Sequence, residues 1–395
     1  MERMFVGVDI SKDSFSAAGL DHEGKERFSG SYSMDSEGFG KFLEVMSRHL
    51  PDREKVLVAM ESTACYHINL FSFLTSQGIQ ALVVNPLLIS NFAKRSLRKT
   101  KTDKKDAWTI AKFLIENREE ISQLSVSPDL QDLRDLARER ESLCRLITAI
   151  KVEMKRVLRS IFPELESIAD IHTRVMLRFL QAYPSARAVR RANPKAIVEA
   201  LQGSHVGPKL SFSAEEVIRA ARNSIATGSP AKEIILQGKI ATLLHLQERL
   251  EEITKLLTDL CNETRVEDLN ILQSIKGIGP KTGVPFLAEM GSIENYSSPK
   301  KLIAFAGIDP SVSQSGKFIG KSKLSKRGNR HLRRAIYLMA SSVVSKNALF
   351  KAYFLKRKRE GLPPQKALFA TAHKLIRVIF ALLTKRTYFQ PVGTI

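Results

Sequence analysis

Four acidic residues in the first third of the chain have the types and positions of a metal site. Asp9 and Glu61 each end a short apolar run, as expected at the ends of buried strands. Asp103 and Asp106 lie three residues apart where a helical pattern begins, and therefore on one helix face. Carboxylates that meet at one point repel each other and require cations. Oxygen ligands favour Mg²⁺ or Mn²⁺, and paired ions of this kind suit phosphodiester chemistry. Four scattered surface acids are the alternative.

The elements that would position these acids alternate between strand and helix over residues 1–120. Strand patterns cover 4–10, 14–20, 26–33, 55–61 and 80–85, and helical patterns cover 36–49, 67–77 and 103–117. Three strands before the first helix predict a mixed sheet and not a doubly wound parallel one. We therefore expect an α/β domain of ribonuclease-H-like layout, followed by all-α structure.

Two long helices are predicted in the middle of the chain. Apolar residues recur at alternating spacings of three and four over 129–162 and 231–261, and only Arg140 interrupts the first series. A sustained repeat of 3.5 residues with charged flanks is typical of a coiled coil. Packing of the two helices on each other within one chain and packing on a partner chain are both compatible with this pattern.

The positive charge is concentrated at the C-terminal end. The chain carries a net +21, and residues 297–395 hold 21 Lys and Arg against only two acids, Asp309 and Glu360. A region of this charge is expected to bind a polyanion, most often nucleic acid. An anionic membrane surface is the alternative partner. No segment reaches the roughly 18 uninterrupted apolar residues of a membrane span, so we expect no membrane partner. Three cysteines without a CxxC pattern predict a reduced, cytoplasmic protein.

Two motifs lie in or beside this basic region. Gly277-Ile278-Gly279 resembles the hairpin of a helix-hairpin-helix element, whose amides approach a phosphate, although a plain helix turn uses the same residues. Ser315-Gly316 precedes a tract of cations that can bind a phosphodiester and stabilise developing charge, which makes Ser315 a candidate nucleophile. An ordinary turn serine is the alternative. The residues predicted to contact nucleic acid are Lys101, Gly277, Gly279, Lys281, Lys317, Lys321, Lys326, Arg327, Arg330, Arg333, Arg334, Lys356, Arg357, Lys358 and Arg359.

These motifs together carry a family likeness. The chain resembles the DEDD transposases of bacterial insertion sequences (insertion-sequence family one hundred and ten), which are bridge-RNA-guided serine recombinases. The likeness covers roughly residues 1–120 and 265–345. Its motifs are Val8-Asp9-Ile10-Ser11-Lys12, Glu61-Ser62-Thr63, Lys101-Thr102-Asp103-Lys104-Lys105-Asp106-Ala107, Gly277-Ile278-Gly279, Phe305-Ala306-Gly307, Ser315-Gly316 and Lys326-Arg327-Gly328-Asn329.

The resemblance implies a specific organisation and mechanism. A RuvC-like domain over 1–120 would hold Mg²⁺ or Mn²⁺ on its four acids, a helical coiled-coil region would cover 121–264, and a helical transposase domain would cover 265–395. Ser315 would form a covalent phosphoserine link to DNA during excision and insertion of the element. Donor and target DNA would be selected by a non-coding guide RNA. The resemblance further implies a homo-oligomer, a dimer or tetramer, that acts in the cytoplasm at the nucleoid of a bacterium or archaeon.

Three other functions fit parts of the pattern. A structure-selective nuclease of the Holliday-junction resolvase type would use the acids with water, and Ser315 would then be a turn residue. An actin-like or sugar-kinase-like phosphotransferase also places Gly-x-Asp on its first strand, but the chain shows no glycine-rich phosphate loop of that class. A purely RNA-binding module would use the basic tail and show no metal dependence.

Overall fold

The computed structural model describes residues 3–61, 66–84, 89, 92, 103–117, 128–202, 212–311, 314–315, 318–319, 323–326 and 328–390. The chain divides into two compact units. One comprises residues 1–131 with 290–305, and the other comprises residues 132–289 with 306–395. Because the arrangement of the two units is not determined, each is described by itself. The three predicted domains, 1–120, 121–264 and 265–395, stay a prediction.

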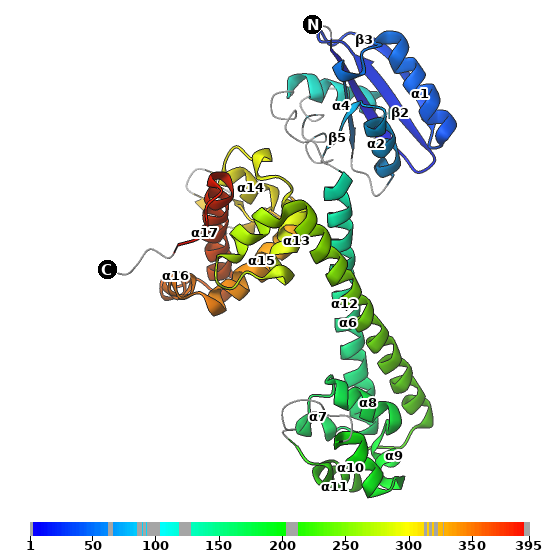
Figure 1. The fold of residues 1–395 in the computed structure, drawn as a ribbon, viewed down its shortest axis with the longest axis vertical. Coiled ribbons are helices and arrows are strands. Elements are labelled where there is room, and N and C mark those ends of the chain that lie inside the picture. The colour runs from blue at the N-terminus through cyan, green and yellow to red at the C-terminus, as the bar shows by residue number, and fades with distance from the viewer. Residues whose placement is uncertain are drawn as a thin grey trace. The chain divides into compact units, whose positions relative to one another are not determined.

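The first unit contains a mixed five-stranded sheet (Figure 1). Its strand order is β3-β2-β1-β4-β5. The first three strands form an antiparallel meander, whereas β1–β4 and β4–β5 pair in parallel. The sheet is therefore mixed, as the three strands before the first helix predicted. The strands are β1 (Met4–Ile10), β2 (Ser14–Leu20), β3 (Glu26–Ser33), β4 (Val56–Glu61) and β5 (Gln80–Val84).

Helices cover both faces of this sheet. Even-numbered residues of β1 and β4, such as Val8 and Met60, pack in one apolar core with residues of α1 (Ser36–His49) and α2 (His67–Ser76). Phe5 and Leu57 point to the opposite face, where they share a second core with α4 (Asp103–Glu116). Side chains alternate along a strand, so odd-numbered positions of β1 and β4 face α4. A short 3-10 turn, η1 (Arg53–Lys55), leads into β4.

Gly7 allows α4 to approach β1 closely. A Cβ atom at this position would lie 2.1 Å from the carbonyl oxygen of Ala107 and 2.3 Å from the amide nitrogen of Ala111. Both distances are far inside van der Waals contact, and both neighbours are backbone atoms that cannot rotate away. Glycine is therefore required where the helix crosses the strand, two residues before Asp9.

We expect Gly7→Ala to displace α4 and to lower stability by roughly 1–3 kcal/mol, the usual effect of overpacking. Gly40→Ala is the matched control, because Gly40 lies in α1 with open space around it. Alanine there should stabilise by about 0.5–1 kcal/mol through its helix propensity. Urea unfolding of both variants measures the difference, and equal stability of the two would contradict the steric argument.

In the second unit, α6 (Pro128–Ile161) and α12 (Pro230–Gln273) run antiparallel and side by side (Figure 1). Met154 of α6 and Ile240 of α12 lie in one buried cluster. Arg140, which interrupts the predicted seam, donates from Nε to Oγ1 of Thr254 at 3.1 Å. The two helices therefore pack on each other within one chain, one of the two arrangements that the repeat allowed. α12 is longer than predicted and departs from helical geometry at Arg265.

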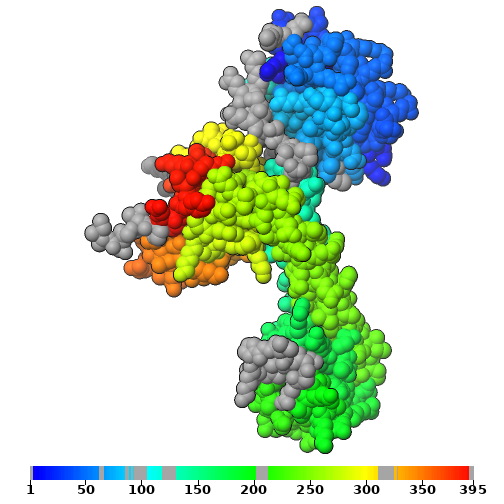
Figure 2. Space-filling model, in the orientation of Figure 1, coloured from blue at the N-terminus to red at the C-terminus, as the bar shows by residue number. Residues whose placement is uncertain are grey.

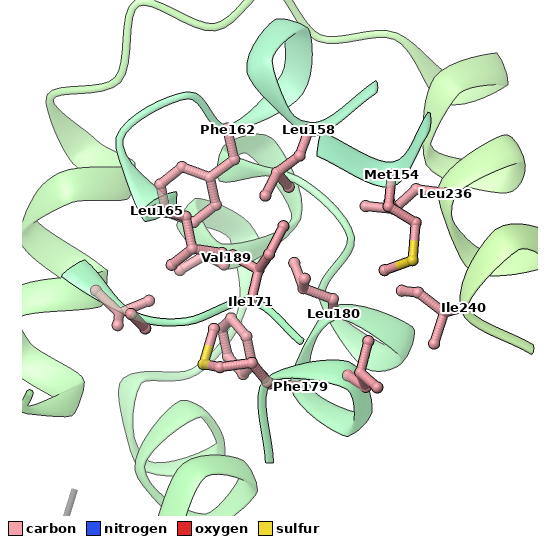
Figure 3. Packing of buried hydrophobic residues seen from close by; sticks show 14 of the residues in the cluster. Met154, Leu158, Phe162, Leu165, Ile171, Phe179, Leu180, Val189, Leu236 and Ile240 are labelled. Atoms are coloured by element: carbon pink, nitrogen blue, oxygen red, sulfur yellow. The ribbon is translucent and has the colours of Figure 1, made fainter. Parts of the chain in front are cut away.

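Five short helices lie around the far end of this pair (Figure 1). With all atoms drawn, the green residues at that end form one compact body (Figure 2). Phe162, Leu165, Phe179 and Leu180 are buried there together with Met154 (Figure 3). This segment has no interpretable sequence motif, and the structure shows that it shares one hydrophobic core with the ends of α6 and α12. The helices are α7 (Leu165–Ile168), α8 (Arg174–Ala182), α9 (Ala186–Arg191), α10 (Pro194–Gln202) and α11 (Ala214–Arg222).

The C-terminal part of the chain adds helices and four two-residue strands. The helices are α13 (Pro280–Met290), α14 (Pro299–Phe305), α15 (Arg330–Lys346), α16 (Ala348–Arg359) and α17 (Pro364–Lys385), with a 3-10 turn η2 (Ile293–Asn295). The strands are β6 (Pro310–Ser311), β7 (Gln314–Ser315), β8 (Phe318–Ile319) and β9 (Lys323–Leu324). Among the described helices, α17 alone is long and apolar enough to cross a membrane. Leu375, Ile376 and Ile379 are fully buried, so this length and composition reflect a core helix.

Candidate active site

Asp9 and Glu61 stand side by side at the ends of two parallel strands. Val8 of β1 pairs with Met60 of β4, and the two acids are the next residues on each strand. Both carboxylates are half-buried and occupy odd-numbered positions, which face α4. The register thus puts Asp9 and Glu61 on adjacent strands, while their convergence with Asp103 and Asp106 on one point stays a prediction.

Asp103 and Asp106 occupy the first turn of α4. Ala107 and Ile110, which meet Gly7 of β1, lie one turn after Asp103 and Asp106 respectively. The helix face that touches β1 therefore continues into the acid pair. Asp106 is half-buried, and the side chain of Asp103 lies outside the described residues.

The described side chains alone do not complete a metal site. Within the described part of the chain, no three His, Cys, Asp or Glu side chains are close enough together to hold an ion. The donors that are present are half-buried carboxylates, which suit a hard divalent cation.

Ser315 is the last residue of β7, immediately before the connection to β8. Its backbone pairs with that of Phe318 in an antiparallel ribbon. In a separate two-stranded sheet, Ser311 of β6 pairs with Lys323 of β9. The side chain of Ser315 is outside the described residues.

The two glycines of the predicted phosphate-binding hairpin differ in their surroundings. Gly277 has φ +109°, and its carbonyl accepts a 2.7 Å hydrogen bond from Ser342 Oγ of α15. A Cβ there would lie 2.8 Å from Val343 Cα, so this glycine permits close helix packing. Gly279 has open space around it, and Lys281 beside it is exposed. An anion can approach Gly279 more easily than Gly277.

The predicted cations are distributed over the C-terminal helices. Arg333 donates to the carbonyl of Ala306 at 3.0 Å, and Arg334 lies 3.6 Å from Glu141. Further cations are exposed at Lys326, Arg330, Lys356, Lys358 and Arg359, while Arg357 pairs with Glu360. Lys101, Lys317, Lys321 and Arg327 lie outside the described residues.

The second unit contains a buried carboxylate, Glu289, that no sequence motif indicated. Glu289 is 2% exposed and accepts from Arg138 of α6 at 2.7 and 3.1 Å. It also accepts from Asn329 Nδ2 at 2.7 Å, while Asn329 Oδ1 caps α15. The network thus ties the residue before α15 to α6. Glu289 could have been found from the sequence, because it is a single acid within the apolar run Phe286-Leu287-Ala288-Glu289-Met290.

We expect Glu289→Gln to lower stability by roughly 2 kcal/mol at neutral pH. Breaking a buried ion pair costs about 3–5 kcal/mol, and partial exposure of Arg138 reduces this. Burial alone raises the pKa of Glu289, but hydrogen bonds and charge from Arg138 and a hydrogen bond from Asn329 outweigh it and lower that pKa.

The stabilisation by Glu289 is therefore present above its ordinary pKa of 4.5 and is lost as pH falls through the lowered value. Denaturation of wild type and the glutamine variant at pH 7 and below pH 4 tests this. Glu294→Gln, on the exposed turn η2, is the control. A stability difference that does not shrink in acid would contradict the assignment.

Comparison with known proteins defines the class of this protein. A family model of DEDD transposases of the IS110 type matches residues 6–163, and a second, described as "Transposase IS116/IS110/IS902 family", matches residues 269–355. The chain therefore has the domains of a transposase, an enzyme that cleaves and rejoins DNA. More particularly, it carries both the N-terminal DEDD domain and the C-terminal domain of the IS110-type enzymes. The DEDD class implies dependence on a divalent metal.

Several relatives match over nearly their whole length. An uncharacterised 44.8 kDa protein of insertion element IS116 from Streptomyces clavuligerus is 25% identical, over 99% of this chain and 97% of its own. A pilin gene-inverting protein from Moraxella lacunata is 21% identical over 99% and 98%. The transposase for insertion sequence element IS1111A from Coxiella burnetii is 23% identical over 98% and 91%.

Proposed function

We propose that this transposase moves its DNA element by metal-assisted attack of Ser315 on a DNA phosphodiester, with Asp9, Glu61, Asp103 and Asp106 as the metal ligands. The observation that carries the proposal is the register of β1 and β4. It puts Asp9 and Glu61 on adjacent strand ends, on the face covered by the helix that begins with Asp103 and Asp106.

The four acids fit the role of cation ligands. Two come from neighbouring strands of a rigid sheet, and two come from one helix that Gly7 holds against that sheet. Rigid elements keep ligands in place more accurately than loops do. A bound Mg²⁺ or Mn²⁺ would neutralise charge on the scissile phosphate.

The serine supplies a different chemical function. Attack by its Oγ forms a phosphoserine ester and releases a DNA hydroxyl, and attack by a DNA hydroxyl on that ester restores the serine. Each step exchanges one phosphodiester for another, so rejoining needs no external energy source. The exposed cations Lys326 and Arg330, on the same unit as Ser315, would hold the DNA backbone.

The nucleic-acid partners follow from charge and from family likeness. The net +19 of residues 297–395 suits donor and target DNA and a non-coding guide RNA, both bound through their backbones. A homo-oligomer in the cytoplasm completes the proposal. Much of the apolar face of α6 and α12 is already buried within one chain. Protomers would therefore also need surfaces other than this face to associate.

One gel tests the proposal. The protein is incubated with Mg²⁺, the paired DNA substrates and RNA transcribed from the flanks of its gene, then denatured and examined for covalently attached DNA. A protein–DNA adduct that EDTA prevents is expected. Cleavage without an adduct would favour the second candidate, a resolvase-type nuclease, for which the register of Asp9 and Glu61 on adjacent strands is equally suitable.

A further inference from the structure

An open pocket in the second unit combines cations with aromatic rings. Its volume is about 310 Å³, and it lies between the start of α15, the loop before it and the first half of α17. The described lining residues are Leu324, Lys326, Arg330, Arg333, Arg334, Tyr337, Gln365 and Phe369. No carboxylate occurs among these described lining residues, so the pocket attracts an anion.

The three arginines of the pocket contact neighbouring groups that restrict their side chains. Arg333 is fixed by the carbonyl of Ala306 at 3.0 Å, and Arg330 Nε lies 3.2 Å from His331 Nε2. Glu141, outside the lining, lies 3.6 Å from Arg334 and offsets part of one charge. Lys326 is exposed. Three arginines in addition to a lysine present far more donors than Glu141 can satisfy, and planar guanidinium groups suit phosphate oxygens.

The aromatic part of the pocket is formed by two helices. The ring centroids of Tyr337 of α15 and Phe369 of α17 are 5.7 Å apart, and Tyr337 is 37% exposed. An exposed ring beside arginines is unusual for a surface that binds only a phosphate backbone. Aromatic side chains stack on unpaired bases, whose faces are hidden inside a duplex.

We propose that this pocket binds one unpaired nucleotide, with its phosphate on Lys326, Arg330 and Arg333 and its base against Tyr337. The inference rests on the proposed function only in taking nucleic acid as the ligand. It requires neither the serine chemistry nor the metal. A single-stranded segment of DNA and one of RNA share this chemistry, and the experiment distinguishes them.

Binding is measured in EDTA, where strand cleavage is absent, with the full chain. The probes are oligonucleotides that contain 2-aminopurine: single-stranded DNA, single-stranded RNA of the same sequence, and the DNA duplex. We expect 2-aminopurine quenching with one or both single strands and less with the duplex. Tyr337→Leu should abolish the quenching and weaken single-strand affinity roughly 5- to 100-fold, the contribution of stacking one base.

Two control variants separate stacking from folding. Tyr337→Phe retains the ring and should retain quenching and affinity. Tyr388→Leu removes a ring that is 58% exposed outside the pocket lining, and it should leave both unchanged. The single strand that binds more tightly identifies the source of the nucleotide.

Three outcomes would overturn the proposal. One is equal affinity of Tyr337→Leu and wild type for both single strands. Another is equal quenching of 2-aminopurine fluorescence in the duplex and in the single strands. The third is full competition by polyglutamate at equal charge, which would make the pocket a site for acidic peptides. None of these bears on the covalent adduct, so the pocket and the serine mechanism can fail separately.

Discussion

Replacing Ser315 with alanine is expected to abolish the covalent protein–DNA adduct and to lower strand exchange on the order of 10³-fold or more, as removal of a nucleophile does. The reason is chemical, because alanine offers no oxygen to carry the phosphate between strands. The cations of the second unit remain, so DNA affinity should change little. The readout is denaturing electrophoresis of end-labelled substrate together with a recombination assay.

Ser311→Ala is the matched control for this substitution. Ser311 is also a serine in a two-residue strand of the same segment, paired with Lys323 of β9, while Ser315 pairs with Phe318 of β8. The control variant should keep adduct formation. Retained recombination by Ser315→Ala would refute the nucleophile assignment. If Ser315→Ala lost the adduct but still cleaved DNA, the enzyme would be a metal-dependent nuclease that uses water as nucleophile.

The sheet could be predicted closely because its periodicities are local. β1, β2 and β3 begin and end where the strand patterns do, and β4 begins one residue later than predicted. β5 agrees with its pattern up to residue 84, and residue 85 lies outside the described residues. The heptad repeats predicted two long helices for the same reason. They could not predict which helix packs on which, because an apolar seam fits an intrachain and an interchain partner equally well.

The segment between the long helices was not predictable in detail. Its helices are four to nine residues long and converge on one core from several directions, so no single period runs through the sequence. α12 also exceeds its predicted end at 261. Beyond that point Leu269 and Leu272 are buried outside the seam, after the departure from helical geometry at Arg265.

In the candidate site, too, local sequence patterns indicated individual residues but not which of them are neighbours in space. Strand ends and helical spacing indicated Asp9, Glu61, Asp103 and Asp106 one by one. Whether Asp9 and Glu61 are neighbours depends on the parallel register of β1 and β4, which spans about fifty residues and leaves no local signature. Glu289 was missed because its partners, Arg138 and Asn329, are 151 and 40 residues away.

Neutralising one acid should eliminate metal-dependent cleavage. We expect Asp9→Asn or Asp106→Asn to lower DNA cleavage on the order of 10³-fold, because each removes an anionic ligand from a site that depends on all four. Without metal the same variants should be as stable as wild type or more stable, because close carboxylates repel each other and an amide relieves that repulsion. A role in folding alone would predict the opposite stability change.

Thermal unfolding with and without metal distinguishes these cases. At a concentration near one hundred times the dissociation constant, Mg²⁺ or Mn²⁺ should stabilise wild type by about 2.7 kcal/mol and the variants by much less. Asp13→Asn is the matched control, since Asp13 is an exposed acid just beyond the end of β1. It should keep both cleavage and the metal-induced shift. If Asp13→Asn and Asp9→Asn lost the metal response equally, the effect would be one of general surface charge, and the four-acid site would be wrong.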